Sequence, residues 1–269
     1  MKITIPLYTK IETKVKFLCE KLKLTSREQR KGRPALIPVS SVIAMSIFKQ
    51  RSQIATKKAL FDIFKEKLSC TYKTLVVSMI RYAKIALALT ASLYRWNEKD
   101  AHVVKHVDAT DIPVCSNRKA KNHKTMKEHA GWSKTGKGWF YGLKLHITTD
   151  LKRQMLRAQF TTANVDDRKV MLHMNEELYG IFVGDAGYSG ASIAKEFAIE
   201  HKRILFAKQQ PQMRKITTSF QSFLYGTRML IELNFRSLKM FYGLVTSMPR
   251  SVNGYFANYI YSLLASQIA

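Results

Sequence analysis

The sequence predicts an α/β fold in which helices flank a mixed sheet and a small all-helical domain precedes it. Apolar residues recur three and four positions apart through residues 1–98, which is the period of a helix. Short β-rich runs begin after Asp100, and helical and strand-like segments then alternate. Three successive strands ahead of such an alternation are typical of a mixed sheet rather than an all-parallel one.

The helical domain is expected to cover residues 1–98 and to contain four helices. The expected starts are Lys10, Ser40 or Ser41, Thr56, and the position after Thr71. Their apolar positions fit one buried face for each helix.

The second domain is expected to cover residues 99–269. Its predicted strands are 102–108, 139–149, 154–162, 181–183 and 203–207. Its predicted helices are 166–178, 191–201 and a long one after Ser219.

The charge balance is unusual for a folded chain. Lys and Arg number 45 and Asp and Glu number 19, which leaves a net charge of +26. Because such an excess repels itself in a compact body, a polyanionic partner is expected. Nucleic acid is the first candidate and an anionic membrane surface the second.

Export and membrane insertion are not expected. Pro6 interrupts the apolar stretch 3–8, and Lys10 follows it, unlike a signal peptide. The apolar segments 85–93 and 255–268 are too short or too interrupted to span a bilayer, so we interpret both as core helices. Three scattered cysteines fit a reducing compartment.

Two segments place acids at the end of an apolar strand. Asp108 and Asp111 follow Val103, and their spacing puts them on opposite sides of a continuing strand. Asp185 ends a second strand among small residues, where open α/β sheets bind ligands. The alternative interpretation of each acid is a turn residue.

The helix after Ser219 carries a polar stripe. Tyr225, Arg228, Glu232 and Lys239 fall within an arc of roughly 60° at 100° per residue. The alternative is a solvated face with incidental ion pairs. Three acids from two strands and a helix suit Mg²⁺, whereas the scattered histidines form no zinc motif.

Four motifs together resemble the DDE transposases of bacterial insertion sequences. They are Asp-Ala-Thr at 108–110, Asn-Val-Asp-Asp at 164–167, Gly-Asp-Ala-Gly-Tyr at 184–188, and the spacing Tyr-x2-Arg-x3-Glu-x6-Lys at 225–239. Pro-Val-Cys at 113–115 and Gly-Trp-Phe-Tyr-Gly at 138–142 are similar to the insertion sequence 982 family. The similarity covers nearly the whole chain.

This resemblance implies an RNase H-like catalytic domain that cleaves phosphodiester bonds at the element's ends and transfers the 3′ hydroxyl into target DNA. It implies that Asp108, Asp185 and Glu232 are the catalytic acids and hold Mg²⁺ or Mn²⁺, as two ions. It also implies that Tyr225, Arg228 and Lys239 bind DNA.

The implied partners are double-stranded DNA with terminal inverted repeats, target DNA, and a second copy of the chain in a homodimer on paired ends, in the nucleoid of the bacterial cytoplasm. Recognition of the ends by residues 1–98 is a further hypothesis. Two alternatives stay open: a non-catalytic DNA-binding remnant, and a metal-dependent nuclease that does not join strands.

A basic stretch, residues 118–144, carries eight Lys and Arg against only Glu128. We expect its first part to bind DNA phosphates, through Arg118, Lys119, Lys121 and Lys124. Aromatic residues among these cations suit stacking on unpaired bases. The alternative is a solvated loop followed by a buried strand, and burial is the expected state of residues 139–141.

Overall fold

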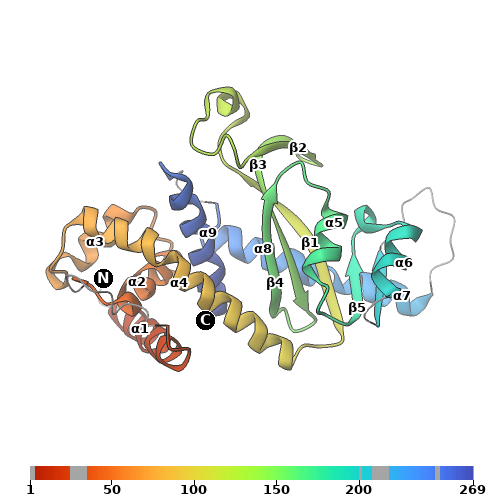
Figure 1. Cartoon of the computed structure of the whole chain (residues 1–269), viewed down its shortest axis with the longest axis horizontal. Coiled ribbons are helices and arrows are strands. Elements are labelled where there is room, and N and C mark those ends of the chain that lie inside the picture. Colours follow the sequence, from red (N-terminus) through yellow and green to blue (C-terminus); the bar gives the residue numbers. More distant parts are fainter. Residues whose placement is uncertain (1–3, 25–34, 200–201, 208–217, 246–248, 269) are drawn as a thin grey trace. The chain divides into compact units, whose positions relative to one another are not determined.

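The computed structural model describes residues 4–24, 35–199, 202–207, 218–245 and 249–268. The chain divides into two compact units (Figure 1). The helical unit comprises Met1–Leu93 and Ser237–Ala269, and the sheet unit comprises Tyr94–Arg236.

The helical unit is built around one apolar core. Its helices are α1 (Thr4–Lys21), α2 (Val39–Arg51), α3 (Lys57–Phe64), most of α4 (Tyr72–Lys99) and α9 (Val252–Gln267). α2 is the central helix, because its residues from Val42 to Gln50 are all buried. The predicted start at Thr56 is confirmed, since its side chain caps α3 by accepting a hydrogen bond from the Ala59 amide.

α1 begins six residues before the predicted start at Lys10. Pro6 lies in its first turn, where a helix leaves its backbone amides without intrahelical partners. The missing N–H of proline therefore costs nothing there. Pro6 is therefore compatible with the first turn of α1, and only the predicted start at Lys10 is wrong.

α9 packs in the helical unit, although the sequence analysis grouped it with residues 99–269. Ala257, Leu264 and Ile268 join the helical core, and the Tyr261 hydroxyl donates a hydrogen bond of 2.8 Å to the Met79 carbonyl. An apolar helical pattern predicts burial, but it carries no information about which neighbour covers the helix.

α4 is long and apolar enough to cross a membrane by length and composition. Leu75, Met79, Ala86 and Leu89 of this helix are buried in the helical core. One face of α4 is therefore buried in a core, as expected for residues 85–93, whereas its Val77 and Leu87 are exposed.

The sheet unit contains a six-stranded mixed sheet in the order β2-β3-β1-β5-β6, with β4 also paired to β3. The strands are β1 (Val104–Pro113), β2 (Gly131–Thr135), β3 (Gly138–Asp150), β4 (Met155–Thr162), β5 (Gly180–Gly184) and β6 (Arg203–Ala207). β1, β3 and β4 pair antiparallel, whereas β5 pairs parallel with β1 and β6. The predicted mixed sheet is confirmed, and it is consistent with an RNase H-like domain.

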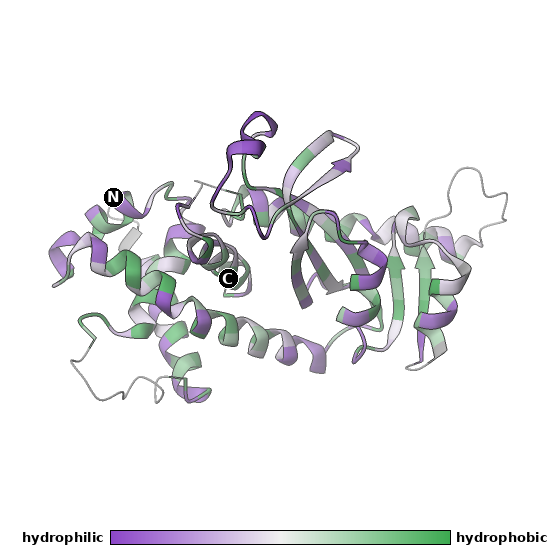
Figure 2. Ribbon diagram, turned by 45° about the horizontal axis from the view of Figure 1, so that its top comes forward, coloured by the Kyte–Doolittle hydropathy of each residue, from purple (hydrophilic) through white to green (hydrophobic). Residues whose placement is uncertain are grey.

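Helices cover both faces of this sheet. Val107 and Phe182 pack on one face with residues of α5 (Asp167–Met174) and α6 (Ala191–Ile199). Val104 and Val183 pack on the other face with Leu224 of α7 (Ser219–Thr227), which α8 (Met229–Met240) follows. β5, which lies between β1 and β6, is hydrophobic through its middle because both of its faces are covered, whereas the central strands that carry the acids show hydrophilic positions in Figure 2.

Two strands differ from their predicted bounds. β1 runs five residues past Asp108, because its pairing with β3 continues to Pro113 opposite Gly142. β2 was missed, since its residues had been interpreted as part of the basic stretch. It forms a hairpin with β3 across Gly136 and Lys137, and Gly138 takes a φ of +111°, which glycine adopts readily.

Candidate active site

Asp108 and Asp185 lie side by side on one face of the sheet. The parallel pairing of β1 with β5 ends at His106 opposite Val183, two residues before each acid. Continuing this register by two residues places Asp108 next to Asp185, on strands ~4.8 Å apart. Asp111 lies opposite Lys144 on β3, whereas Asp108 lies opposite Ile147, so the two β1 acids face opposite sides as their spacing predicts.

The turn after β5 holds the Asp185 side chain. Its Oδ1 accepts a hydrogen bond of 2.8 Å from the Gly187 amide. Asp185 thereby caps the short helix Ala186–Tyr188. A Cβ at Gly187 would lie 3.0 Å from that same oxygen. A larger residue at this position would therefore require the Asp185 carboxylate to shift by a few tenths of an ångström.

Asp108 is a carboxyl group in a poorly solvated place. Its side chain is only 15% exposed, and its pKa is raised to about 6. Burial is the main cause, and the charge of Asp185 adds to it. Arg228 and the Ala109 amide lower the pKa in part.

Arg228 connects two of the three predicted acids. Its Nη2 lies 3.2 Å from Asp108 Oδ2, and its Nη1 lies 3.1 Å from Glu232 Oε1. The Arg228 Nε is buried and has no hydrogen-bond partner among the described residues. The Glu232 side chain remains 57% exposed.

The helix predicted after Ser219 is interrupted at Arg228, which separates α7 from α8. The Thr227 hydroxyl donates a hydrogen bond of 2.6 Å to the Leu224 carbonyl and lies 2.9 Å from Nε2 of His106, a buried residue of β1. Such side-chain bonds compete with the helical pattern. The assumption of one continuous helix was therefore wrong, while the pairing of Arg228 with Glu232 persists.

Tyr225 and Lys239, the other residues of the predicted stripe, have different surroundings. The Tyr225 hydroxyl donates a hydrogen bond of 2.7 Å to the Ala207 carbonyl at the end of β6, and its ring packs against an apolar cluster. Lys239 lies in the last turn of α8, in the part of the chain that belongs to the helical unit.

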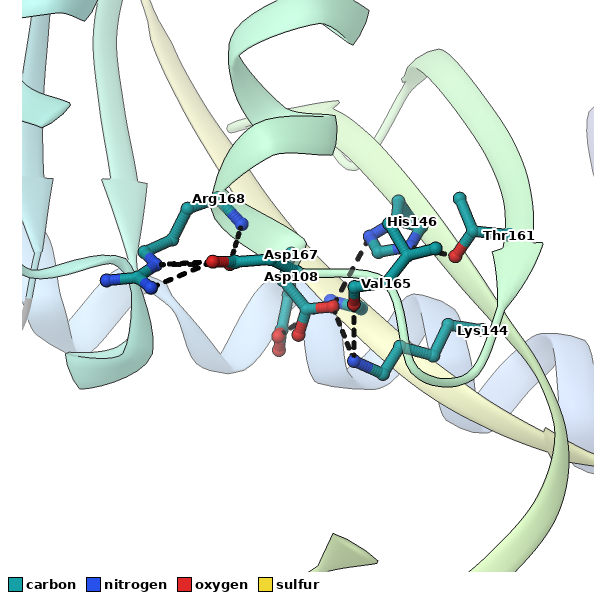
Figure 3. Close-up of polar contacts among 9 residues, drawn as sticks. Asp108, Lys144, His146, Thr161, Val165, Asp167 and Arg168 are labelled. Atoms are coloured by element: carbon teal, nitrogen blue, oxygen red, sulfur yellow. Dashed lines mark hydrogen bonds and ion pairs between the residues drawn. The ribbon is translucent and has the colours of Figure 1, made fainter. Parts of the chain in front are cut away.

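A polar network that sequence reasoning missed lies on the face of the sheet opposite to Asp108, where Lys144 of β3 pairs with Asp111. Lys144 Nζ donates hydrogen bonds to Asp167 Oδ1 at 2.8 Å and to the Val165 carbonyl at 3.1 Å (Figure 3). Buried His146 bonds Thr161 through Nε2, and its Nδ1 lies 3.9 Å from Asp167 Oδ1. The sequence did offer a signal for this network: Lys144 and His146 stand two positions apart among apolar residues, so they lie on the same face of the strand.

Tyr188 relates this network to the paired acids. Its ring is buried, and its pKa is raised well above the ordinary value. Burial is the largest cause, followed by the negative charges of Asp108, Asp167 and Asp185. The negative charges of carboxylates from β1, from the start of α5 and from the end of β5 thus all act on one phenol.

The donor set suits a hard divalent cation at two of the three predicted positions. Asp108 and Asp185 offer neighbouring carboxylates, and a cation there would relieve both burial and like-charge repulsion. Nε2 of His106 and of His146 is occupied by a threonine hydroxyl. Among the described residues, no three His, Cys, Asp or Glu side chains converge closely enough to hold a metal ion.

The four predicted DNA-binding cations of the basic stretch are all on the surface of the sheet unit. Arg118, Lys119, Lys121 and Lys124 are exposed, around the short helix Asn117–Asn122. Ala120 and Met126 are buried and anchor this segment, which is strongly hydrophilic in Figure 2.

The aromatic residues after this segment divide between core and surface. Phe140 and Tyr141 are buried, as predicted, but the Trp139 side chain is 59% exposed. Alternation along β3 turns Trp139 away from the core, beside Lys134 of β2 and near the exposed Trp132.

One comparison with known proteins bears on this arrangement. The sequence model of a family described as Transposase DDE domain matches residues 98–252, which is more than half of the chain. The matched region contains Asp108, Asp185, Arg228 and Glu232. No solved structure matches the chain.

Proposed function

Because the chain belongs to the transposase DDE domain family, we propose that it cleaves phosphodiester bonds at the ends of an insertion sequence and joins each freed 3′ hydroxyl to target DNA. Asp108, Asp185 and Glu232 are the proposed catalytic acids. The observation that supports this most directly is the placement of Asp108 beside Asp185, with Arg228 linking Asp108 to Glu232.

The three carboxylates would hold two divalent cations, Mg²⁺ or Mn²⁺; when bound, these would supply Lewis-acid chemistry for an in-line displacement at phosphorus. Asp108 is ionised above its pKa of about 6, so it is ready to act as a ligand at neutral pH. Arg228 neutralises Asp108 and Glu232 through its two Nη atoms.

We further propose that the chain is similar to the insertion sequence 982 family and carries its Tyr-Arg-Glu-Lys signature at Tyr225, Arg228, Glu232 and Lys239. The ion pair between Arg228 and Glu232 supports the Arg-x3-Glu part of that signature. Arg228 and Lys239 would bind DNA phosphates. Tyr225 would position the turn at Arg228, because its hydroxyl is used by the Ala207 carbonyl.

The proposed partners are the terminal inverted repeats, target DNA and a second copy of the chain, in the bacterial nucleoid. The net charge of +26 and the exposed basic segment support DNA binding. End recognition by residues 1–98 is proposed as well, and a gel-shift assay of the full chain with repeat DNA and scrambled DNA tests specific binding.

The deciding experiment uses DNA that carries the element's terminal repeats, with Mg²⁺ and again with chelator. We expect Mg²⁺-dependent nicking at the repeat end, followed by joining to target DNA. Nicking without joining would indicate the nuclease, and binding without nicking would indicate the non-catalytic remnant.

Neutralising the basic segment should flatten the salt dependence of DNA binding. We expect the combined change of Arg118, Lys119, Lys121 and Lys124 to Gln to reduce the log–log slope by up to about 3.6, at about 0.9 per phosphate. A matched control changes four exposed lysines elsewhere in the sheet unit to Gln: Lys152, Lys169, Lys195 and Lys202. Equal salt-dependence slopes for the two variants would show that the basic segment does not contact DNA.

A further inference from the structure

The helical unit contains a cavity of about 600 Å³ that plays no part in the proposed chemistry. Residues of α2, α3, α4 and α9 line it, together with the segment just before α9. Its polar side is cationic: Lys49, Lys57 and Arg250 line it, and none of its described lining residues is Asp or Glu.

Lys49 is the most unusual of these cations. The residue is only 5% exposed and lines the cavity, and its ammonium group has no hydrogen bond or ion pair with any described residue. Burial, followed by the nearby charge of Lys57, lowers the pKa of Lys49 to about 8. An ammonium group that is buried without a partner destabilises the fold unless an anion pairs with it.

Two helix N-termini reach the same cavity. Thr56 caps α3, Ser251 caps α9, and both line the cavity, as does Gly254 in the first turn of α9. The first turn of a helix has backbone amides without intrahelical partners and a partial positive charge, and both favour a phosphate group.

Ser46, Gln50 and Asn258 add neutral polar groups to the wall, and much of the remainder is apolar. Tyr72, Val76, Met79, Ile80 and Tyr261 line it. An inorganic anion would leave most of this volume unused, whereas cavities of roughly 300–1,000 Å³ hold small organic ligands.

We propose that this cavity binds a nucleotide, with its phosphate at Lys49, Lys57 and the start of α9, and its sugar and base against the apolar wall. The nucleotide can come from a DNA strand or from solution, since the chemistry is the same. All residues that line this site belong to the helical unit. The proposal therefore does not depend on the role of the acids in the sheet unit.

The test measures binding of deoxyadenosine monophosphate to the full chain by calorimetry, in chelator so that no divalent cation contributes. We expect one molecule bound per chain and no binding of deoxyadenosine, which lacks the phosphate. A short single-stranded oligonucleotide that displaces the monophosphate would identify a DNA strand as the source, and failure to displace it would identify the free nucleotide.

Lys49→Met keeps the length of the side chain and removes its charge. We expect at least tenfold weaker binding, together with a higher melting temperature of the free protein, because an unpaired buried charge is lost. Arg250→Ala, at an exposed position that cannot unfold the chain, should weaken binding severalfold. Lys84→Met removes an exposed charge of α4 outside the cavity and should bind like the unmodified chain.

Absence of binding by the monophosphate would overturn the proposal. So would equal binding by Lys49→Met, Arg250→Ala and Lys84→Met, or equal binding of deoxyadenosine.

Discussion

Asp108→Asn is expected to abolish Mg²⁺-dependent nicking of repeat DNA and, at the same time, to stabilise the fold at neutral pH. The amide keeps the shape of the carboxylate but loses the charge that holds a divalent cation. Stability rises because the pKa of Asp108 is about 6 when folded and near 3.8 in its ordinary state. About two pKa units correspond to about 3 kcal/mol of unfolding free energy.

The sign of this effect sets its pH window. Between about pH 4 and pH 6, the folded state holds a proton that the unfolded state has lost, so stability falls as pH rises. The Asn variant lacks this proton, and its gain over the unmodified protein should therefore vanish near pH 4. Denaturant unfolding at pH 4 and pH 7.5 measures the difference, and single-turnover nicking measures the activity.

Two further variants control this prediction. Asp185→Asn should also abolish nicking, with DNA binding within a few fold of the unmodified chain. Asp111→Asn should nick normally, because Asp111 faces the opposite side of β1.

Mg²⁺ should raise the melting temperature of the unmodified protein but not that of Asp108→Asn. Normal nicking by Asp108→Asn together with loss in Asp111→Asn would show that the wrong acid on β1 was chosen.

Glu232→Gln is expected to eliminate chemistry at little cost in stability. The Glu232 side chain is 57% exposed, and its ion pair with Arg228 is of the surface type, which contributes little. The change removes a carboxylate ligand while Arg228 keeps its bond to Asp108. Cleavage of a pre-bound repeat end, with the melting temperature of each variant, tests this expectation.

Arg236→Ala is the internal control on the same helix. It lies one turn beyond Glu232 at an exposed position and should reduce cleavage far less. Lys239→Ala should mainly weaken binding of the cleaved end. If Glu232→Gln cleaves fully, or if Arg236→Ala loses as much activity, the stripe is a solvated face and the non-catalytic interpretation gains support.

Local patterns in the sequence were enough for the architecture. Helical periodicity predicted the N-terminal helices, and the alternation after Asp100 predicted a mixed sheet, because both depend on which residues an element buries. The position of Asp185 at the end of an apolar strand was readable for the same reason. The spacing of Arg228 and Glu232 predicted neighbours four residues apart, and their ion pair matches it.

Tertiary structure decided which elements meet. The parallel register that brings Asp185 beside Asp108 joins strands 77 positions apart at the acids, and no local pattern encodes it. The break at Arg228 lies beside a hydrogen bond between Thr227 and His106 of β1, which is 121 positions away in the sequence. The packing of α9 in the helical unit, and the cavity around Lys49, arise from contacts across some 200 residues. Sequence periodicity predicts which apolar side chains are buried. Which residues they pack against is decided only by the packing of the whole chain.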